Sequence, residues 1–136
     1  MTIEASPELG WLSLTAMMTG LLWVPHIINR LMEQGVPQAL WDPAGATATR
    51  RAWAERMMKA HANAVENLVV FAPLAIAVHL SGSGTAATAS AAMVYFFARL
   101  GHFLVFSFGV PVLRVVLFAL GFVCQAVLAL NLLGWM

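Results

Sequence analysis

The chain has 136 residues, of which 61% are hydrophobic and 10% are charged, and its mean hydropathy is +0.83. Soluble domains contain about half apolar and about a quarter charged residues, so this composition excludes an ordinary water-soluble globule. The net charge of +1 gives no long-range field for nucleic acid, and a single cysteine, Cys124, excludes an internal disulfide.

Four apolar stretches are long enough to cross a membrane, which takes about 20 residues in a helix. They predict helices over about residues 9–28, 53–80, 86–108 and 112–135. The length suits a single integral membrane domain, residues 1–136. The sequence therefore predicts an all-α membrane protein built as a four-transmembrane-helix bundle.

The connections between these helices differ in charge. The first, a loop of about residues 29–52, carries Arg30, Arg50 and Arg51 and also contains prolines and glycines that forbid a long helix, whereas residues 81–85 carry no charge. The positive-inside rule then places the loop in the cytoplasm and both termini on the non-cytoplasmic side. Compact loops and the lack of an organelle signal favour the inner membrane of a bacterium.

Polar residues in the second predicted helix lie on one face. Arg56, Lys59, Asn63 and Glu66 follow one another at steps of three, four and three. At about 100° per residue, this spacing keeps them within an arc of about 80°. Ionisable groups inside a membrane helix are costly and mark pockets, pathways or internal pairs, so this face is a candidate functional surface.

The third and fourth predicted helices carry polar faces as well. On the third, Tyr95, Arg99, His102 and Phe106 repeat at helical spacing. On the fourth, Arg114 lies in the first turn, with aromatic and polar residues further along its face. Three helices thus present polar side chains at comparable depth.

One interpretation is a neutral pair between Glu66 and Arg99, because a buried charge is tolerated when it is paired. That pair leaves unexplained the other basic residues near this membrane face, which are Arg56, Lys59, His102 and Arg114. A surplus of positive charge in a partly dry cavity predicts an anionic ligand. Guanidinium and amide groups suit a small peptide that carries carboxylates.

The remaining histidines of the second helix point elsewhere. His61 lies about 140° around the helix from Arg56 and shares its direction with His79, so we expect both to be packing or interfacial groups. No Cys, Asp or Glu stands at metal-ligand spacing with any histidine, and we expect no metal site. The motifs of the common soluble enzyme classes are absent from the sequence.

These polar faces also carry a family signature. The run 55–68, ERMMKAHANAVENL, followed by Phe71, resembles the second-helix signature of the membrane-associated proteins in eicosanoid and glutathione metabolism, the MAPEG family. The run Ala98-Arg99-Leu100 with His102, and Pro111-Val112-Leu113-Arg114, resemble later landmarks of that family. The resemblance extends from residue 25 to residue 125.

The resemblance implies an assembly and a ligand. Three copies would form a homotrimer, with glutathione as cosubstrate bound between neighbouring subunits near the cytoplasmic face. Carried over position by position, it makes Arg114 the catalytic residue that holds the glutathione sulfur as a thiolate. It assigns binding of the remaining glutathione peptide to Arg30, Arg56, Lys59, Asn63, Glu66, Arg99 and His102.

The implied activity is that of a membrane-bound glutathione transferase or peroxidase, whose thiolate attacks a lipophilic electrophile or hydroperoxide arriving from the lipid. Phe106 and Val115 stand where some relatives have tyrosine and serine, and Lys59 replaces an arginine. These departures keep open a non-catalytic glutathione- or lipid-binding membrane protein. A less favoured alternative is a small multidrug exporter with Glu66 as its proton-exchanging carboxylate, against which the surrounding cations argue.

Overall fold

The computed structural model describes residues 4–42, 45 and 48–136. All regular structure in these residues is helical, in the order α1 (Pro7–Leu21), α2 (Val24–Gln34), α3 (Val36–Trp41), α4 (Ala52–Ser81), α5 (Ala86–Ser107) and α6 (Pro111–Leu132). Four candidate membrane spans are long and apolar enough to cross a bilayer, namely Pro7–Gln34, Ala52–Ser81, Ala86–Ser107 and Pro111–Leu132. The predicted all-α bundle with four spans is confirmed.

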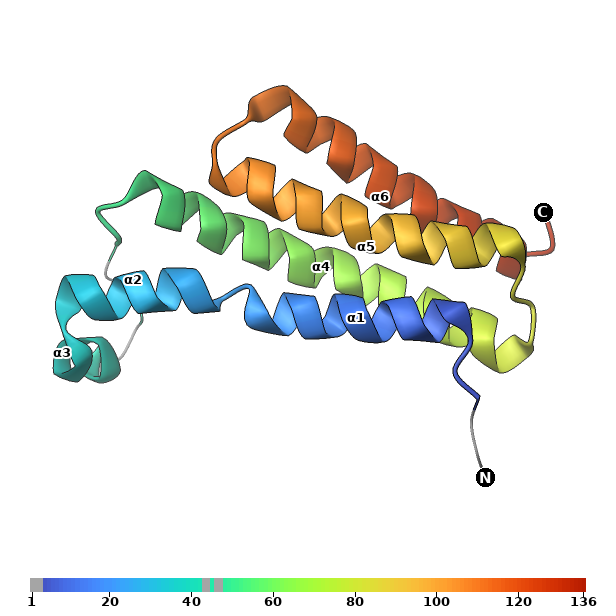
Figure 1. The fold of residues 1–136 in the computed structure, drawn as a ribbon, viewed down its shortest axis with the longest axis horizontal. Helices are drawn as coiled ribbons and strands as arrows, with labels where there is room; N and C mark the ends of the chain where they lie inside the picture. Colours follow the sequence, from blue (N-terminus) through green and yellow to red (C-terminus); the bar gives the residue numbers. More distant parts are fainter. Residues whose placement is uncertain (1–3, 43–44, 46–47) are drawn as a thin grey trace.

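The long helices run lengthwise beside one another, and both termini lie at the same end (Figure 1). Helix α5 contacts α1, α4 and α6, and its contact with α6 is the most extensive. Helix α2 continues the direction of α1, while α3 folds back along α2 at the end away from the termini (Figure 1). Polar side chains on α4, α5 and α6 therefore face one another inside a single bundle.

The first span is broken where the sequence predicts one helix over 9–28. Helix α1 ends at Leu21 and α2 begins at Val24. Pro25 has no backbone N–H to donate to the carbonyl of Leu21, so the helix cannot continue unbroken. His61 of α4 contacts the end of α1 next to the break, where its Nε2 lies 3.0 Å from the carbonyl oxygen of Thr19.

The connection between the first and second spans is more helical than the predicted loop of residues 29–52. Helix α2 continues to Gln34, and Gly35, with φ of +80°, turns the chain into the six-residue α3. Glycine suits this turn because it adopts positive φ without a Cβ clash. The prolines and glycines of this stretch do prevent one long helix, as predicted. The chain nevertheless forms two short helices there, where the sequence predicts an irregular loop.

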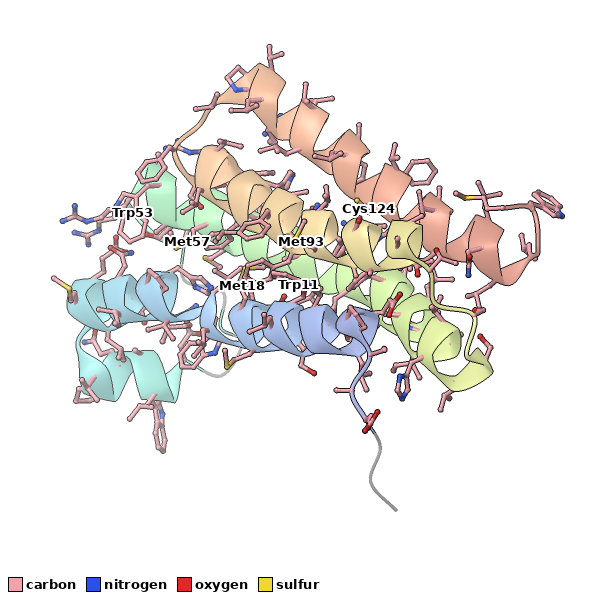
Figure 2. All side chains as sticks on the ribbon, turned by 45° about the vertical axis from the view of Figure 1, so that its right-hand side comes forward. Trp11, Met18, Trp53, Met57, Met93 and Cys124 are labelled. Atoms are coloured by element: carbon pink, nitrogen blue, oxygen red, sulfur yellow. The ribbon has the colours of Figure 1, made fainter. Side chains whose placement is uncertain are left out.

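The core lies between α1, α4, α5 and α6. Phe71 and Tyr95 stack at 3.8 Å between ring centroids with an interplanar angle of 14°. Buried Cys124 belongs to this cluster, and Figure 2 shows it on α6 beside α5. His79 lies in the last turns of α4 with its Nδ1 3.0 Å from the hydroxyl of Ser6. His61 thus contacts α1, and His79 contacts the residue that caps the N-terminus of α1.

The Phe71 ring gives a direct test of this core. Phe71 is fully buried, so Phe71→Ala removes the stack on Tyr95 and leaves a cavity, a change that costs about 3–5 kcal/mol in protein cores. We expect a clear fall in the melting temperature of the detergent-solubilised protein. Val69→Ala on the same helix is the control, because Val69 is 69% exposed. Equal melting of both variants and the wild type would contradict the packing described.

Candidate functional site

A hydrogen-bonded cluster joins α4 and α5 in the middle of the bundle. Arg99 is 2% exposed, and its Nη2 donates to the Oδ1 of Asn63 at 2.5 Å. The same nitrogen lies 3.4 Å from the Nδ1 of His102, one turn further along α5. Asn67 donates from Nδ2 to the same Asn63 oxygen at 3.3 Å. The spacing of three residues on α5 and four on α4 places these groups on facing surfaces.

The cluster contains buried donors that the described part of the chain does not satisfy. The Nε and Nη1 of Arg99 and the hydroxyl of Tyr95 have no hydrogen-bond partner there. Gly121 of α6 lies against both residues, since a Cβ at that position would be 3.5 Å from the Cδ of Arg99. Because a buried guanidinium is costly without an anionic partner, these free donors mark a place that favours an anion.

The pairing of Glu66 with Arg99, one of the interpretations of the sequence, is wrong for the single chain. Within the described residues, Arg99 bonds to the neutral amide of Asn63, and Glu66 is exposed without an ion pair. Glu66 is rotated by about 60° around α4 from Asn63, and this rotation is enough to carry its carboxylate out of the contact with α5. Arg99 is therefore buried without an intramolecular counter-ion in the described chain.

Arg114 joins this cluster through aromatic rings. It is half-buried near the start of α6, and its Cζ lies 4.7 Å from the ring centroid of Phe106. The His102 ring lies 5.7 Å from Phe106 and 6.2 Å from Phe118, between centroids. A guanidinium over a ring is attracted by the negative π face. Arg114 is thus held by a neutral group and keeps its charge available.

Arg56 closes the same end of the bundle. Its Nε donates to the carbonyl oxygen of Ser107 at 2.9 Å, which caps the last turn of α5. Gly109, with φ of +76°, follows that turn, and a Cβ there would approach the Arg56 guanidinium to 3.4 Å. Arg56 therefore fixes the α5–α6 turn that leads to Arg114.

Three of the predicted site residues stay outside the cluster. Arg30 pairs with Asp42 at 2.6 Å, and Lys59 pairs with Glu55 at 3.1 Å on the exposed surface. Glu66 is also exposed. Of four cavities in the described structure, three are lined by none of the predicted site residues. The fourth, of about 40 Å³, is lined in part by Arg30. A complete pocket around Arg99 and Arg114 is not among these cavities.

Sequence reasoning missed two members of the site, Asn67 and Ser107. Asn67 lies four residues after Asn63 and also accepts from the Nε2 of Gln125 through its carbonyl, at 3.2 Å. This spacing of four residues places Asn67 on the same face of α4 as Asn63, and it could have identified Asn67 from the sequence. Ser107 contributes its backbone carbonyl, which any residue would supply, so the sequence held no signal for it. No group of three or more metal-ligating side chains is gathered within the described residues.

A comparison with protein families gives a match over most of the chain. The model of the MAPEG family matches residues 9–134, which is nearly the whole chain. No curated protein and no solved structure matches the chain. The matched range contains all the residues of the cluster.

The Asn63–Arg99 bond is testable by stability. Asn63→Leu leaves a further N–H of Arg99 without an acceptor, which costs about 1–3 kcal/mol or more for a charged donor. We expect a lower melting temperature in detergent. Asn63→Asp keeps the oxygen and adds a counter-ion, so it should melt at or above the wild-type temperature. If the leucine variant matched the wild type, Asn63 would not be the partner that holds Arg99.

Proposed function

The chain belongs to the MAPEG family, and from this membership we propose that it is a membrane-bound glutathione-dependent transferase or peroxidase. The four candidate spans and the family make it an integral membrane protein. The family includes glutathione transferases and peroxidases. Under the proposal, glutathione is the cosubstrate, no metal takes part, and the second substrate is a lipophilic electrophile or hydroperoxide.

The observation that carries the proposal is the buried Arg99 guanidinium with two unpartnered nitrogens. The Nε and Nη1 of Arg99 each keep a hydrogen to donate, and carboxylate oxygens are strong acceptors for a charged guanidinium. Glutathione has two carboxylates, so it fits this donor set. Asn63 orients Arg99, while His102 and Arg56 line the same side of α4 and α5.

The predicted site residues that lie outside the cluster support a site shared between subunits. Glu66 lies midway along α4 and is exposed without an ion pair in the described chain. A carboxylate facing lipid is costly, so this face calls for a covering partner. In the proposed homotrimer, a neighbouring copy covers it, and Glu66 receives the amino group of glutathione. Lys59 and Arg30 then bind from the rim of the same site.

Arg114 has the catalytic role in this proposal. Bound glutathione supplies a thiol, whose thiolate form is the nucleophile. The Arg114 guanidinium, half-buried and held over Phe106, stabilises that negative charge more strongly than it would in water. In a transferase reaction the sulfur bonds to the electrophilic carbon, and the leaving group departs with its electron pair. The protein contributes positioning and a fixed cation.

A non-catalytic glutathione- or lipid-binding protein is the second candidate. Arg114 faces the aromatic ring of Phe106, and the next residue is Val115, so neither position offers a hydroxyl to a thiolate. Without such donors, the whole stabilisation of the sulfur falls on Arg114. The two candidates therefore differ in whether bound glutathione is ionised near neutral pH.

The test is the ultraviolet thiolate absorbance of glutathione added to the purified, detergent-solubilised protein. We expect a thiolate band near neutral pH in the wild type and in Arg114→Lys, which keeps the charge. In Arg114→Ala the band should vanish and turnover should fall by about 100-fold, as when one charge-stabilising donor is removed from an active site. Binding without a band in the wild type would favour the second candidate. An absence of binding would overturn both, and Glu66 would then be tested as a transport carboxylate.

Phe106 offers a finer test of how Arg114 is held. Phe106→Leu removes the aromatic face, an interaction of about 0.5–2 kcal/mol, so we expect the conjugation rate to fall by about 2–30-fold. Phe106→Tyr keeps the ring and adds a hydroxyl, and it should match or exceed the wild-type rate. The rates are measured with a lipophilic electrophile in detergent micelles. A leucine variant as fast as the wild type would show that the ring does not position Arg114.

A further inference from the structure

The end of the bundle away from the termini carries several exposed apolar side chains. Helices α2 and α3 fold back on one another there (Figure 1). Met32 of α2 is 78% exposed, and Leu40 and Trp41 of α3 are 77% and 87% exposed. Tryptophan is enriched where a membrane meets water. Because α2 ends the first span, these side chains lie where that span leaves the bilayer.

The chain that follows α3 is fastened to this hairpin at Glu33. The hydroxyl of Thr49 donates to the Oε1 of Glu33 at 2.9 Å, and the N–H of Arg50 lies 3.2 Å from both of its oxygens. Asn29 adds a third donor at 3.2 Å. These bonds hold the backbone of Arg50 and Arg51 against α2, although both side chains are exposed.

The carboxylates near these side chains are already engaged. Asp42 pairs with Arg30 at 2.6 Å, and the Glu33 oxygens accept the hydrogen bonds just described. Arg50 attracts Glu33 electrostatically but is not within ion-pair distance of it in the described structure. Arg51 likewise forms no ion pair among the described residues. Two guanidinium groups against one carboxylate leave one net positive charge.

These two arginines line a cavity of about 470 Å³ together with Asn29, Met32 and Glu33. None of its lining residues belongs to the Arg99 cluster. The volume is in the range of small-molecule pockets. Guanidinium groups bind phosphate through paired hydrogen bonds, and Met32 supplies an apolar wall.

We propose that this cavity binds the phosphate headgroup of a phospholipid with one net negative charge, such as phosphatidylglycerol. The single surplus charge of the cavity matches one phosphodiester. Met32 lines the cavity, and the exposed side chains of Leu40 and Trp41 on α3, which packs against α2, provide further apolar surface for the acyl chains. A soluble phosphate would use the two arginines but not this apolar surface, which is why a lipid fits better.

The experiment is native mass spectrometry of the full-length protein in detergent, with phosphatidylglycerol or phosphatidylcholine added. We expect the wild type to retain phosphatidylglycerol preferentially. Arg50→Gln with Arg51→Gln should weaken its retention by about tenfold or more, while Arg50→Lys with Arg51→Lys, which keeps the charge but not the paired hydrogen bonds, should weaken it less. The glutathione thiolate signal should be unchanged in both double variants, so a failure here is separable from a failure of the proposed function.

Further variants separate lipid from soluble anion. Leu40→Ser with Trp41→Ser removes apolar surface and leaves both arginines, so it should weaken phosphatidylglycerol retention on its own. Unchanged retention in the double glutamine variant, or full displacement of the lipid by millimolar inorganic phosphate, would overturn the proposal. If the double glutamine variant loses its melting transition, Arg50→Gln and Arg51→Gln are measured singly. Each should lower retention, and wild-type retention in both would count against the site.

Discussion

The hydrogen bond between Arg99 and Asn63 is the constraint on which the arrangement of this bundle depends. A guanidinium that is 2% exposed must be oriented and partly satisfied, and the Oδ1 of Asn63 at 2.5 Å does both. The bond fixes the rotation of α4 against α5 at the depth where the polar faces meet. Gly121 then lets α6 approach the same side chain closely. The apolar packing of Phe71 on Tyr95 continues from this point along the same helices.

The three cations of the candidate site share one property, which is that a neutral group holds each of them. Arg99 bonds to an amide oxygen, Arg56 to a backbone carbonyl, and Arg114 lies over an aromatic ring. Dipoles and π faces orient a guanidinium without cancelling its charge. Arg30 and Lys59 differ from these three cations, because each forms an ion pair with a carboxylate. Among the described residues, the inner cations are thus held in position without an ion pair, and this is the state that an anionic ligand needs.

Much of this arrangement was predictable from the sequence because it follows from local spacing. Apolar length predicts the four spans, and steps of three and four residues bring Arg99 and His102 onto one face. The hydrogen-bond partner of Arg99 was harder to predict from the sequence. Whether Arg99 meets Asn63 or Glu66 depends on the relative rotation of two helices, which no single-helix pattern contains. The break after Leu21 was not predicted, because the apolar stretch over 9–28 indicates a single helix, although Pro25 explains the break once it is seen. The helices α2 and α3 were also not predicted, and there Glu33 contacts Thr49 and Arg50, which lie outside both helices.

The order of α4 and α5 along the chain has a consequence for biosynthesis. Asn63 is translated before Arg99, and only residues 82–85 connect the two helices. When Arg99 leaves the ribosome and the insertion machinery, its acceptor already belongs to the preceding helix. The two helices can therefore enter the bilayer as a hairpin with the hydrogen bond formed, so that Arg99 does not have to meet the lipid alone. Reversing the order of these two residues between the helices would keep the final contact but alter the conditions under which the chain first reaches it.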